Sequence, residues 1–375
     1  MGDPTHYFVD PSGGDDTTGT GAIGAPWKTV DHALTTITQD STDGDQINIK
    51  DTADDVLSSS LAILVDYGTP SSQSPLVFRG YTSAANDGGI GGIDGNDNAI
   101  VNLGTIDHLH FIDLHLHNSG GSSIFNINRF CHFINCEIDD TTGDGVSTNY
   151  DCLFVNCHFH SIGSYSIDML SGGFVFDCYF AKGSRAAIAC VRKDGPSETT
   201  IAGNIMSVDG TTDGIICSSS SWTSHIYNNS ILSNGGTGQG VFDSGQQLLT
   251  QIYNNVIEGF SGTGGVGIDF DNNGWWDALF ANNSIYNCAT AADLKTDVID
   301  KTNSHETLGS SPFAKSGSDT FANRYTYFAP LNVGEVWGGA YGNSSMDRGA
   351  VQHSGGGGGA IRTPSNAGRF GIVEA

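Results

Sequence analysis

The hexapeptide Phe-Ile-Asn-Cys-Glu-Ile at residues 133–138 returns as Phe-Val-Asn-Cys-His-Phe at residues 154–159. Related hexapeptides occupy residues 111–116, 175–180, 201–206, 226–231, 252–257 and 280–285. Their fourth positions are, in order, Leu114, Cys136, Cys157, Cys178, Asn204, Asn229, Asn255 and Asn283, at steps of 22, 21, 21, 26, 25, 26 and 28 residues. One hexapeptide cannot bury its own apolar side chains, so the repeat predicts turns that stack around a shared core.

A second column of apolar residues keeps step with the first. Its members are Ile124, Val146, Ile167, Ile188, Ile215, Val241 and Ile268. Two columns that drift together indicate one coil, in which each turn is a set of short strands ending in Gly, Asn, Asp or Ser corners. Adjacent rungs of such a coil lie about 4.8 Å apart, so equivalent side chains stack. We therefore predict a buried cysteine column and an asparagine column whose amides hydrogen-bond from rung to rung.

This pattern resembles the right-handed parallel β-helix (pectate-lyase-like) superfamily over residues 109–288, and the resemblance extends to about residue 352. Residues 7–10 (Tyr-Phe-Val-Asp) and 25–29 (Ala-Pro-Trp-Lys-Thr) resemble the opening of such proteins, and residues 311–314 and 347–352 resemble their closing rungs. The resemblance implies an all-β solenoid. It does not choose an activity, because the superfamily holds lyases, hydrolases, epimerases, phage tailspikes and non-catalytic surface proteins.

The sequence predicts four segments. Residues 1–108 form an N-terminal cap and irregular first rungs, with a short capping helix over 26–37 and strands near 46–50 and 76–81. Residues 109–288 form the regular rungs, and residues 289–353 form closing rungs or a C-terminal cap. Residues 354–375 form a linker of five consecutive glycines followed by a docking tail.

Composition removes several function classes. Fifteen Lys and Arg face 41 Asp and Glu, which gives a formal charge of −26 and argues against nucleic-acid binding and against an anionic membrane surface. No apolar run is long enough to span a membrane. No signal peptide is visible, and we expect an extracellular or virion-surface location reached by another route. The eight cysteines contain no Cys-x-x-Cys pair, so we predict reduced structural ladders compatible with a reducing cytosol.

Asp144 and Asp168 fall on consecutive predicted rungs, with Arg185 and Arg192 on the next, and together they form the most lyase-like set. A calcium-assisted lyase needs carboxylates to hold the cation and a basic residue to abstract a proton. Calcium is therefore the one cofactor that these candidates allow, although no cofactor is expected otherwise.

A hydrolase would need two carboxylates that face one bond. Asp144 stands in Gly-Asp-Gly and Asp213 in Thr-Asp-Gly at the same column, which is also the chemistry of a tight corner. On the last regular rung the column holds Ile268, and Asp269 and Asp271 follow closely.

Histidines and carboxylates alternate just after the corner column. His115, Glu137 and His158 would be stacked on one face, with His117, Asp139 and His160 beside them. Such a set is a candidate divalent-metal site, and the alternative is a polar, solvent-facing sheet surface.

Exposed tryptophans and the tail are candidate contacts with partners. Trp222, Trp275 and Trp276 stand in polar insertions, which suits sugar stacking or a subunit contact. Arg362, Arg369 and Phe370 give the tail charge and apolar surface for docking on a protein partner or a sister subunit.

Two functions follow from these features. The first is a non-enzymatic assembly β-helix displayed on a larger particle, such as a phage capsid decoration or tail component, held partly by the tail, forming a homo-oligomer or lattice and possibly binding glycan. The alternative is a secreted carbohydrate-active enzyme, either a polysaccharide lyase or a glycoside hydrolase. The enzyme question stays open from sequence, with the balance against catalysis.

Overall fold

The computed structural model describes residues 4–38, 43–63, 75–102, 106–120, 123–181, 189–195, 197–208, 210–218, 223–244, 249–270, 277–281, 283–294 and 305–307. The chain divides into two compact units, Met1–Gly173 and Phe174–Ala375. In the described residues, both units consist of short parallel strands, and the single helix, α1 (Val30–Thr36), lies in unit 1. The predicted all-β parallel β-helix with a short N-terminal helix is confirmed.

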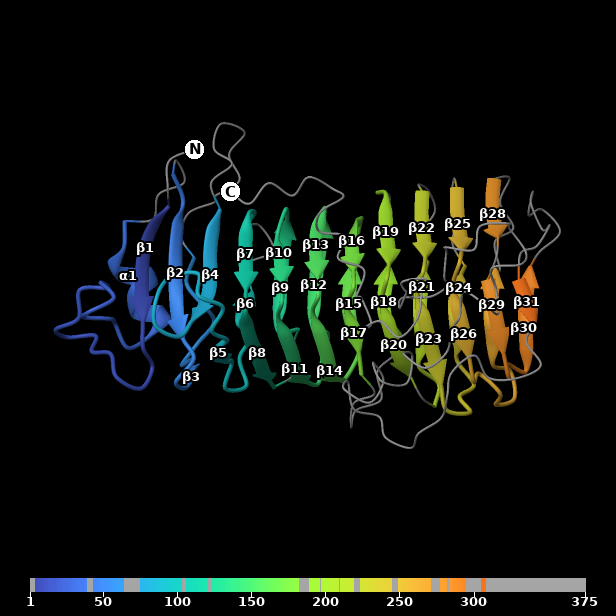
Figure 1. The fold of residues 1–375 in the computed structure, drawn as a ribbon, viewed down its shortest axis with the longest axis horizontal. Coiled ribbons are helices and arrows are strands. Elements are labelled where there is room, and N and C mark those ends of the chain that lie inside the picture. Colours follow the sequence, from blue (N-terminus) through green and yellow to red (C-terminus); the bar gives the residue numbers. More distant parts are fainter. Residues whose placement is uncertain are drawn as a thin grey trace, which may run out of the picture. The chain divides into compact units, whose positions relative to one another are not determined.

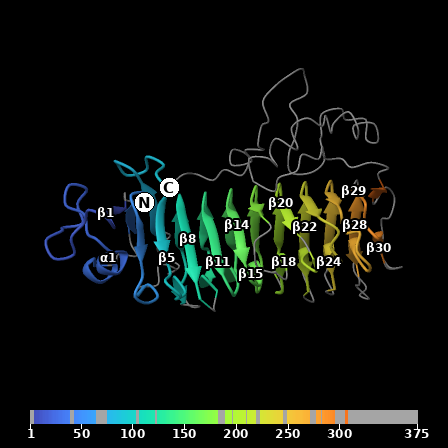
Figure 2. The same cartoon turned by 90° about the horizontal axis from the view of Figure 1, so that it is seen from below.

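Unit 1 contains three parallel sheets, whose strands lie side by side in Figures 1 and 2. The first sheet has the order β1 (Thr5–Val9), β2 (Asp45–Lys50), β4 (Leu76–Tyr81), β7 (Leu109–Ile112), β10 (His132–Ile134) and β13 (Cys152–Val155). The second has the order β3 (Asp54–Val56), β5 (Gly91–Asp94), β8 (Leu114–Ser119), β11 (Glu137–Thr141) and β14 (His158–Ile162). The third has the order β15 (Tyr165–Met169), β12 (Val146–Tyr150), β9 (Phe125–Arg129) and β6 (Val101–Asn102).

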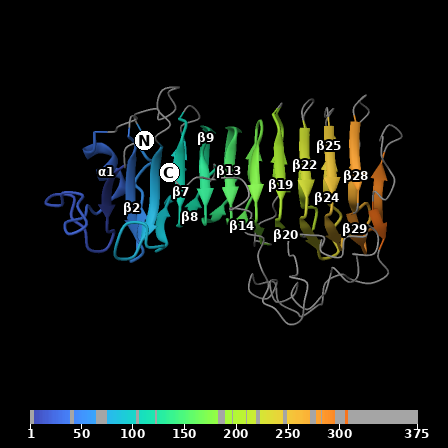
Figure 3. The same cartoon turned by 45° about the horizontal axis from the view of Figure 1, so that its top comes forward.

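Unit 2 repeats the three-sheet arrangement, and Figure 3 shows β19, β22, β25 and β28 side by side. Its first sheet has the order β16 (Gly173–Phe176), β19 (Thr199–Ala202), β22 (Thr223–Tyr227), β25 (Leu249–Tyr253) and β28 (Asp277–Ala281). Its second has the order β17 (Tyr179–Phe180), β20 (Ile205–Val208), β23 (Ser230–Ser233), β26 (Val256–Glu258), β29 (Asn283–Tyr286) and β31 (His305–Thr307). Its third has the order β30 (Thr290–Leu294), β27 (Val266–Phe270), β24 (Gln239–Asp243), β21 (Asp213–Cys217) and β18 (Ala189–Lys193).

The first apolar column forms the core, as the repeat predicts. Phe111, Phe133 and Phe154 are paired in register and fully buried, and their rings stack at centroid distances of 5.0 and 5.1 Å. In unit 2 the same position is Ile226 paired with Ile252. Each such side chain contributes about 1.5–3 kcal/mol through burial, so the column accounts for much of the stability of each unit.

The second apolar column needs two corrections of register. Val146 pairs with Phe125 rather than with the predicted Ile124, and Ile215 pairs with Val191 rather than with Ile188, which lies outside the described residues. Ile124 and Phe125 are both fully buried, because the corner residue before β9 also points into the core. Spacing alone could not choose between two consecutive apolar residues.

The corner between the first and second sheets confirms the predicted asparagine ladder in unit 2. Asn204, Asn229, Asn255 and Asn283 are fully buried, and each Nδ2 of the first three donates to Oδ1 of the next residue at 2.9–3.0 Å. The same Oδ1 atoms accept the backbone N–H of the preceding asparagine at 3.0–3.1 Å. The Nδ2 groups also donate to buried main-chain carbonyls, such as that of Ile201. The ladder therefore satisfies buried groups that a corner would otherwise leave unpaired.

Cysteine holds this corner position at Cys136 and Cys157 in unit 1 and at Cys178 in unit 2, before asparagine takes the position from Asn204 onward. Cys136 and Cys157 are buried, and their thiols donate to the carbonyls of Phe111 and Phe133 at 3.3 Å. All eight cysteines lie within the described residues as free thiols. That they stay reduced in the cell remains a prediction.

The N-terminal helix α1 begins after Thr29, whose side chain accepts the backbone N–H of His32. Its buried face is Val30, Ala33 and Leu34, and it contacts β1 and β2. Within the described ranges, no helix is long and apolar enough to cross a membrane.

Candidate active site

Two aspartates of unit 2 meet at one glutamine. Asp213 begins β21 and Gln239 begins the next strand of the third sheet, β24, each two residues before the paired residues Ile215 and Val241. The backbone N–H of Gln239 donates to Asp213 Oδ1 at 2.6 Å. The Gln239 side-chain amide Nε2 donates to Asp269 Oδ2, also at 2.6 Å. Both carboxyl groups are therefore held within hydrogen-bonding distance of the same residue.

The glycines around Gln239 allow this close approach. A Cβ atom at Gly238 would lie 2.9 Å from Asp213 Oδ1 and closer still to the carbonyl oxygen of Thr212, so a side chain there would displace the carboxyl group. Asp213, Gln239 and Asp269 are all half-buried, which leaves part of each in contact with solvent.

The surroundings of Asp213 weaken its acidity. Burial, together with the neighbouring charge of Asp269, raises the pKa of Asp213 to about 6, while the hydrogen bond from the Gln239 backbone opposes the shift. A carboxyl group with a raised pKa beside a second carboxyl group is an arrangement that suits separate acid and base roles. The pair can donate a proton to one atom and place negative charge beside another.

The sequence contains both aspartates at or near the second apolar column, but its pattern does not predict that they contact the same residue. Asp213 stands in a Thr-Asp-Gly segment typical of a tight corner, and Asp269 simply follows Ile268 of the second apolar column. Gln239 hydrogen-bonds to both aspartates, and a search for paired carboxylates in the sequence does not consider a glutamine.

Three of the four residues of the predicted lyase set lie within the described residues, Asp144 and Asp168 in unit 1 and Arg192 in unit 2. Asp144 serves its corner, where Oδ1 accepts the backbone N–H of Tyr165 at 3.2 Å and Oδ2 accepts the Ser123 hydroxyl at 3.3 Å. Asp168 is 4% exposed on β15, opposite Ser147.

Arg192 belongs to unit 2, on β18, where it lies 4.0 Å from Asp194. Arg185 lies outside the described residues. A lyase site built from these four residues stays a prediction.

The predicted metal set is divided between two groups. His115 gathers with Asp54 and His117, whereas Glu137 gathers with His158 and His160. The acidic, glycine-rich segment 94–98 is a further candidate for calcium, and it forms a turn in which Asp94 Oδ1 accepts the Asn96 N–H and the Asn118 amide, both at 2.7 Å. Calcium binding there stays a prediction.

The residues predicted to contact a glycan or a protein partner fall in other parts of the chain. Trp222, Trp275, Trp276, Arg362, Arg369 and Phe370 all lie outside the described residues, as do the linker and tail at 354–375.

Comparison with known proteins shows a likeness of fold alone. No protein-family model and no curated protein matches the sequence. A GH136 lacto-N-biosidase from Eubacterium ramulus is 13% identical with a TM-score of 0.37, covering 80% of this chain and 67% of that one. The catalytic domain of a GH87 alpha-1,3-glucanase in complex with tetrasaccharides is 13% identical with a TM-score of 0.30, covering 76% and 67%. Both solved proteins are carbohydrate-active.

Proposed function

We propose that this protein is a carbohydrate-active β-solenoid that hydrolyses a neutral polysaccharide at the Asp213–Asp269 pair of unit 2. One observation carries the proposal, namely the glutamine that holds two half-buried carboxyl groups, of which Asp213 has a raised pKa. Glycoside hydrolysis uses such a pair, one member protonating the leaving oxygen while the other assists attack on the sugar.

Each residue takes a role that its surroundings support. Asp213, whose pKa is raised to about 6, donates its proton to the glycosidic oxygen. Asp269 supplies the second carboxylate, and Gln239 fixes the position of both. The charge of −26 favours a neutral polymer, because a polyuronate would be repelled.

The expected assembly role depended on residues 354–375. These residues lie outside the described part of the chain, so display on a phage particle has no structural observation in its favour. The expected location, extracellular or on a virion surface, also stays a prediction.

The test is release of reducing ends from a panel of neutral polysaccharides, with Asp213→Asn and Asp269→Asn compared with the wild type. We expect each variant to lose more than about 100-fold in kcat/KM, because general acid–base groups contribute on the order of 10²–10⁴-fold. Asp144→Asn is the matched control, since Asp144 occupies the equivalent Asp-Gly corner in unit 1 and makes only corner hydrogen bonds.

Two outcomes would reject the proposal. The first is a folded protein that releases no product from any polymer of the panel. The second is turnover that survives in Asp213→Asn at the level of the Asp144→Asn control.

A further inference from the structure

The second sheet of unit 1 carries a two-column array of imidazoles and carboxylates on its outer face. In one column Asp54, Gly92, His115, Glu137 and His158 follow one another in register. In the other column Asp94, His117, Asp139 and His160 do the same. The residues between them, Leu116, Ile138 and Phe159, are fully buried, so strand alternation places every member of the array outside the core.

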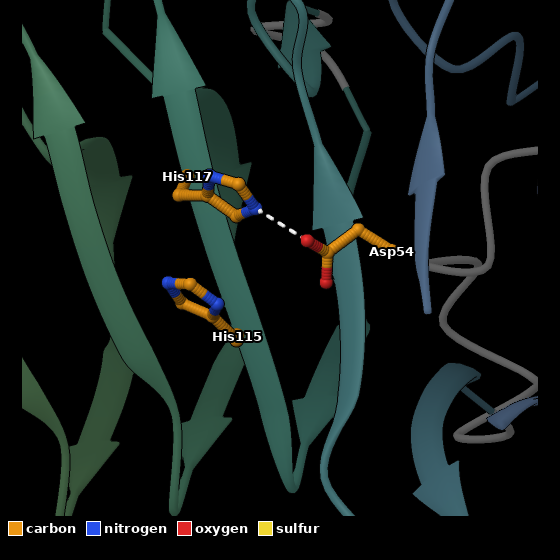
Figure 4. A group of neighbouring side chains, drawn as sticks. All are labelled: Asp54, His115 and His117. Carbon is orange, nitrogen blue, oxygen red and sulfur yellow. Dashed lines mark hydrogen bonds and ion pairs between the residues drawn. The ribbon is translucent and has the colours of Figure 1, made fainter. Parts of the chain in front are cut away.

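The first group of three comprises Asp54, His115 and His117 (Figure 4). The two histidines stand on β8, and their rings stack at a centroid distance of 4.2 Å and an angle of 10°. His117 Nε2 lies 3.3 Å from Asp54 Oδ2, although Asp54 belongs to β3, two strands away in the sheet.

Gly92 makes this reach possible. It lies between Asp54 and His115 in the register, and a Cβ atom there would overlap Asp54 Oδ1. The carboxylate therefore extends over the strand that separates it from the histidines, which no side chain at position 92 would permit.

The second group comprises Glu137, His158 and His160. Glu137 Oε1 lies 2.9 Å from His160 Nε2 and 3.4 Å from His158 Nδ1. The side chains of this group are 26–44% exposed, so water and small ions can reach them.

We propose that each group binds one divalent transition-metal ion of the zinc or cobalt class. Each offers two imidazoles and one carboxylate, and within each group the candidate ligand atoms lie within 4.8 Å of one another. Metal–ligand bonds of about 2.0–2.2 Å need only a small contraction from this arrangement. Imidazole-rich sets favour zinc, copper, iron or nickel over magnesium and calcium, and three protein ligands leave positions open for water.

Asp139 links the two groups as a positioning residue. Its Oδ1 lies 2.9 Å from His115 Nε2 and its Oδ2 lies 3.5 Å from His160 Nε2, and its side chain is 16% exposed. The contact with Asp139 leaves His115 Nδ1 as the nitrogen available to an ion. A carboxylate behind a histidine ligand orients the ring and strengthens the ligand.

The experiment measures Zn²⁺ and Co²⁺ binding to the full chain by isothermal titration calorimetry and by the visible absorption of Co²⁺. We expect two ions per chain. His117→Gln and His160→Gln should each remove one, and the double variant should bind neither. His225→Gln is the matched control, because His225 is a half-buried outer histidine of unit 2 that bonds to Gln251 and Glu198.

Asp139→Asn tests the link between the groups. It should keep two ions and lower the affinity of the site that contains His115 by about 10–100-fold, the usual effect of losing a partner behind a ligand. The Co²⁺ spectrum should show nitrogen ligands in the wild type and lose intensity in the His117→Gln variant.

The proposal is overturned if the folded wild type binds no ion, which would make the array a histidine–carboxylate surface only. It is equally overturned if the double variant, with a wild-type circular dichroism spectrum, binds ions as the His225→Gln control does. Neither result bears on the acid pair of unit 2, whose test is polysaccharide turnover.

Discussion

The same corner of the coil is built from cysteine at Cys136 and Cys157 in unit 1 and from asparagine from Asn204 onward in unit 2. Cys136 and Cys157 fill it with small side chains, and each thiol has two main-chain carbonyls as weak hydrogen-bond acceptors. Asn229 and Asn255 fill it with groups that accept and donate on both sides. One backbone position thus admits either a nearly apolar solution, in which thiols contact main-chain carbonyls, or a polar one, in which each amide hydrogen-bonds to the amides of its neighbours.

The adjoining corner position shows the reverse contrast. In unit 1, Asp113 Oδ1 accepts the amide of Asn135 at 3.0 Å, and Asp113 Oδ2 lies 3.3 Å from Arg79 Nε. In unit 2, Asp177 is followed one rung later by Gly203, which has no side chain to offer, and Asp177 Oδ1 is buried without a hydrogen bond. Here it is unit 2 that leaves a polar group unsatisfied.

The largest expected effect is on the asparagine ladder. Asn229→Leu should lower the free energy of unfolding by about 3–5 kcal/mol, because the amide of Asn204, Oδ1 of Asn255 and the carbonyl of Ile201 all lose partners in a buried site. Urea unfolding followed by circular dichroism measures the change. A loss below about 1 kcal/mol would contradict mutual dependence along the ladder.

The second largest effect concerns how Asp177 changes the free energy of unfolding with pH. Burial raises the pKa of Asp177 to about 7 from 3.8, so the folded state holds a proton that the unfolded state releases at lower pH. This contribution is complete below about pH 4 and is lost as pH rises through about 7.

Asp177→Asn should therefore stabilise the protein by about 1–3 kcal/mol at pH 8 and by little at pH 4. Urea midpoints measured at both values test this, with Asp113→Asn as the control. Equal effects of Asp177→Asn at the two pH values would show that the proton is not held as described.

A smaller effect is expected at the cysteine corner. Cys157→Ala removes a buried thiol and leaves a small cavity without stranding a neighbouring amide, so we expect a loss of about 1–2 kcal/mol. Thermal unfolding of this variant beside Asn229→Leu compares the two solutions directly. A loss as large as that of Asn229→Leu would mean that the cysteine corner is also interdependent.

The smallest effect is expected in the exposed part of the corner. Asn156 has a φ of 53°, and its amide donates to Asn135 Oδ1 at 2.8 Å in an exposed position. Asn156→Gly keeps this backbone conformation available and removes only a solvent-accessible hydrogen bond, so the change should be below about 1 kcal/mol. Asn156→Ala, which disfavours a positive φ, should be the worse of the two in the same urea titration.

The sequence predicted the coil because side chains that must pack on one another recur at one period. The positions of Phe133 and Asn229 followed from that period alone. The period does not predict which of two consecutive apolar residues pairs with the next strand, as at Ile124 and Phe125, because both side chains are buried.

The candidate sites are harder to predict from the sequence, because each depends on a neighbouring residue that a search for acids and histidines does not include. Asp213 and Asp269 are joined through Gln239, and Asp54 reaches His117 only because position 92 is glycine. Residue types and spacing indicate which side chains share a face of a sheet. They do not indicate whether a side chain can extend over the adjacent strand, because this depends on the size of the side chains on that strand.

The asparagine ladder also restricts how this gene can change in length. Consecutive ladder residues are 25, 26 and 28 positions apart, and Asn229 and Asn255 each hydrogen-bond to the asparagine on both sides. Residues inserted in a loop between two corners leave the ladder intact. A deletion that shifts one corner removes the hydrogen-bond partner of the asparagine on each side of it. Duplication or excision of an entire coil restores every contact, so descendants of this chain should differ by whole coils or by loop insertions, and rarely by anything between.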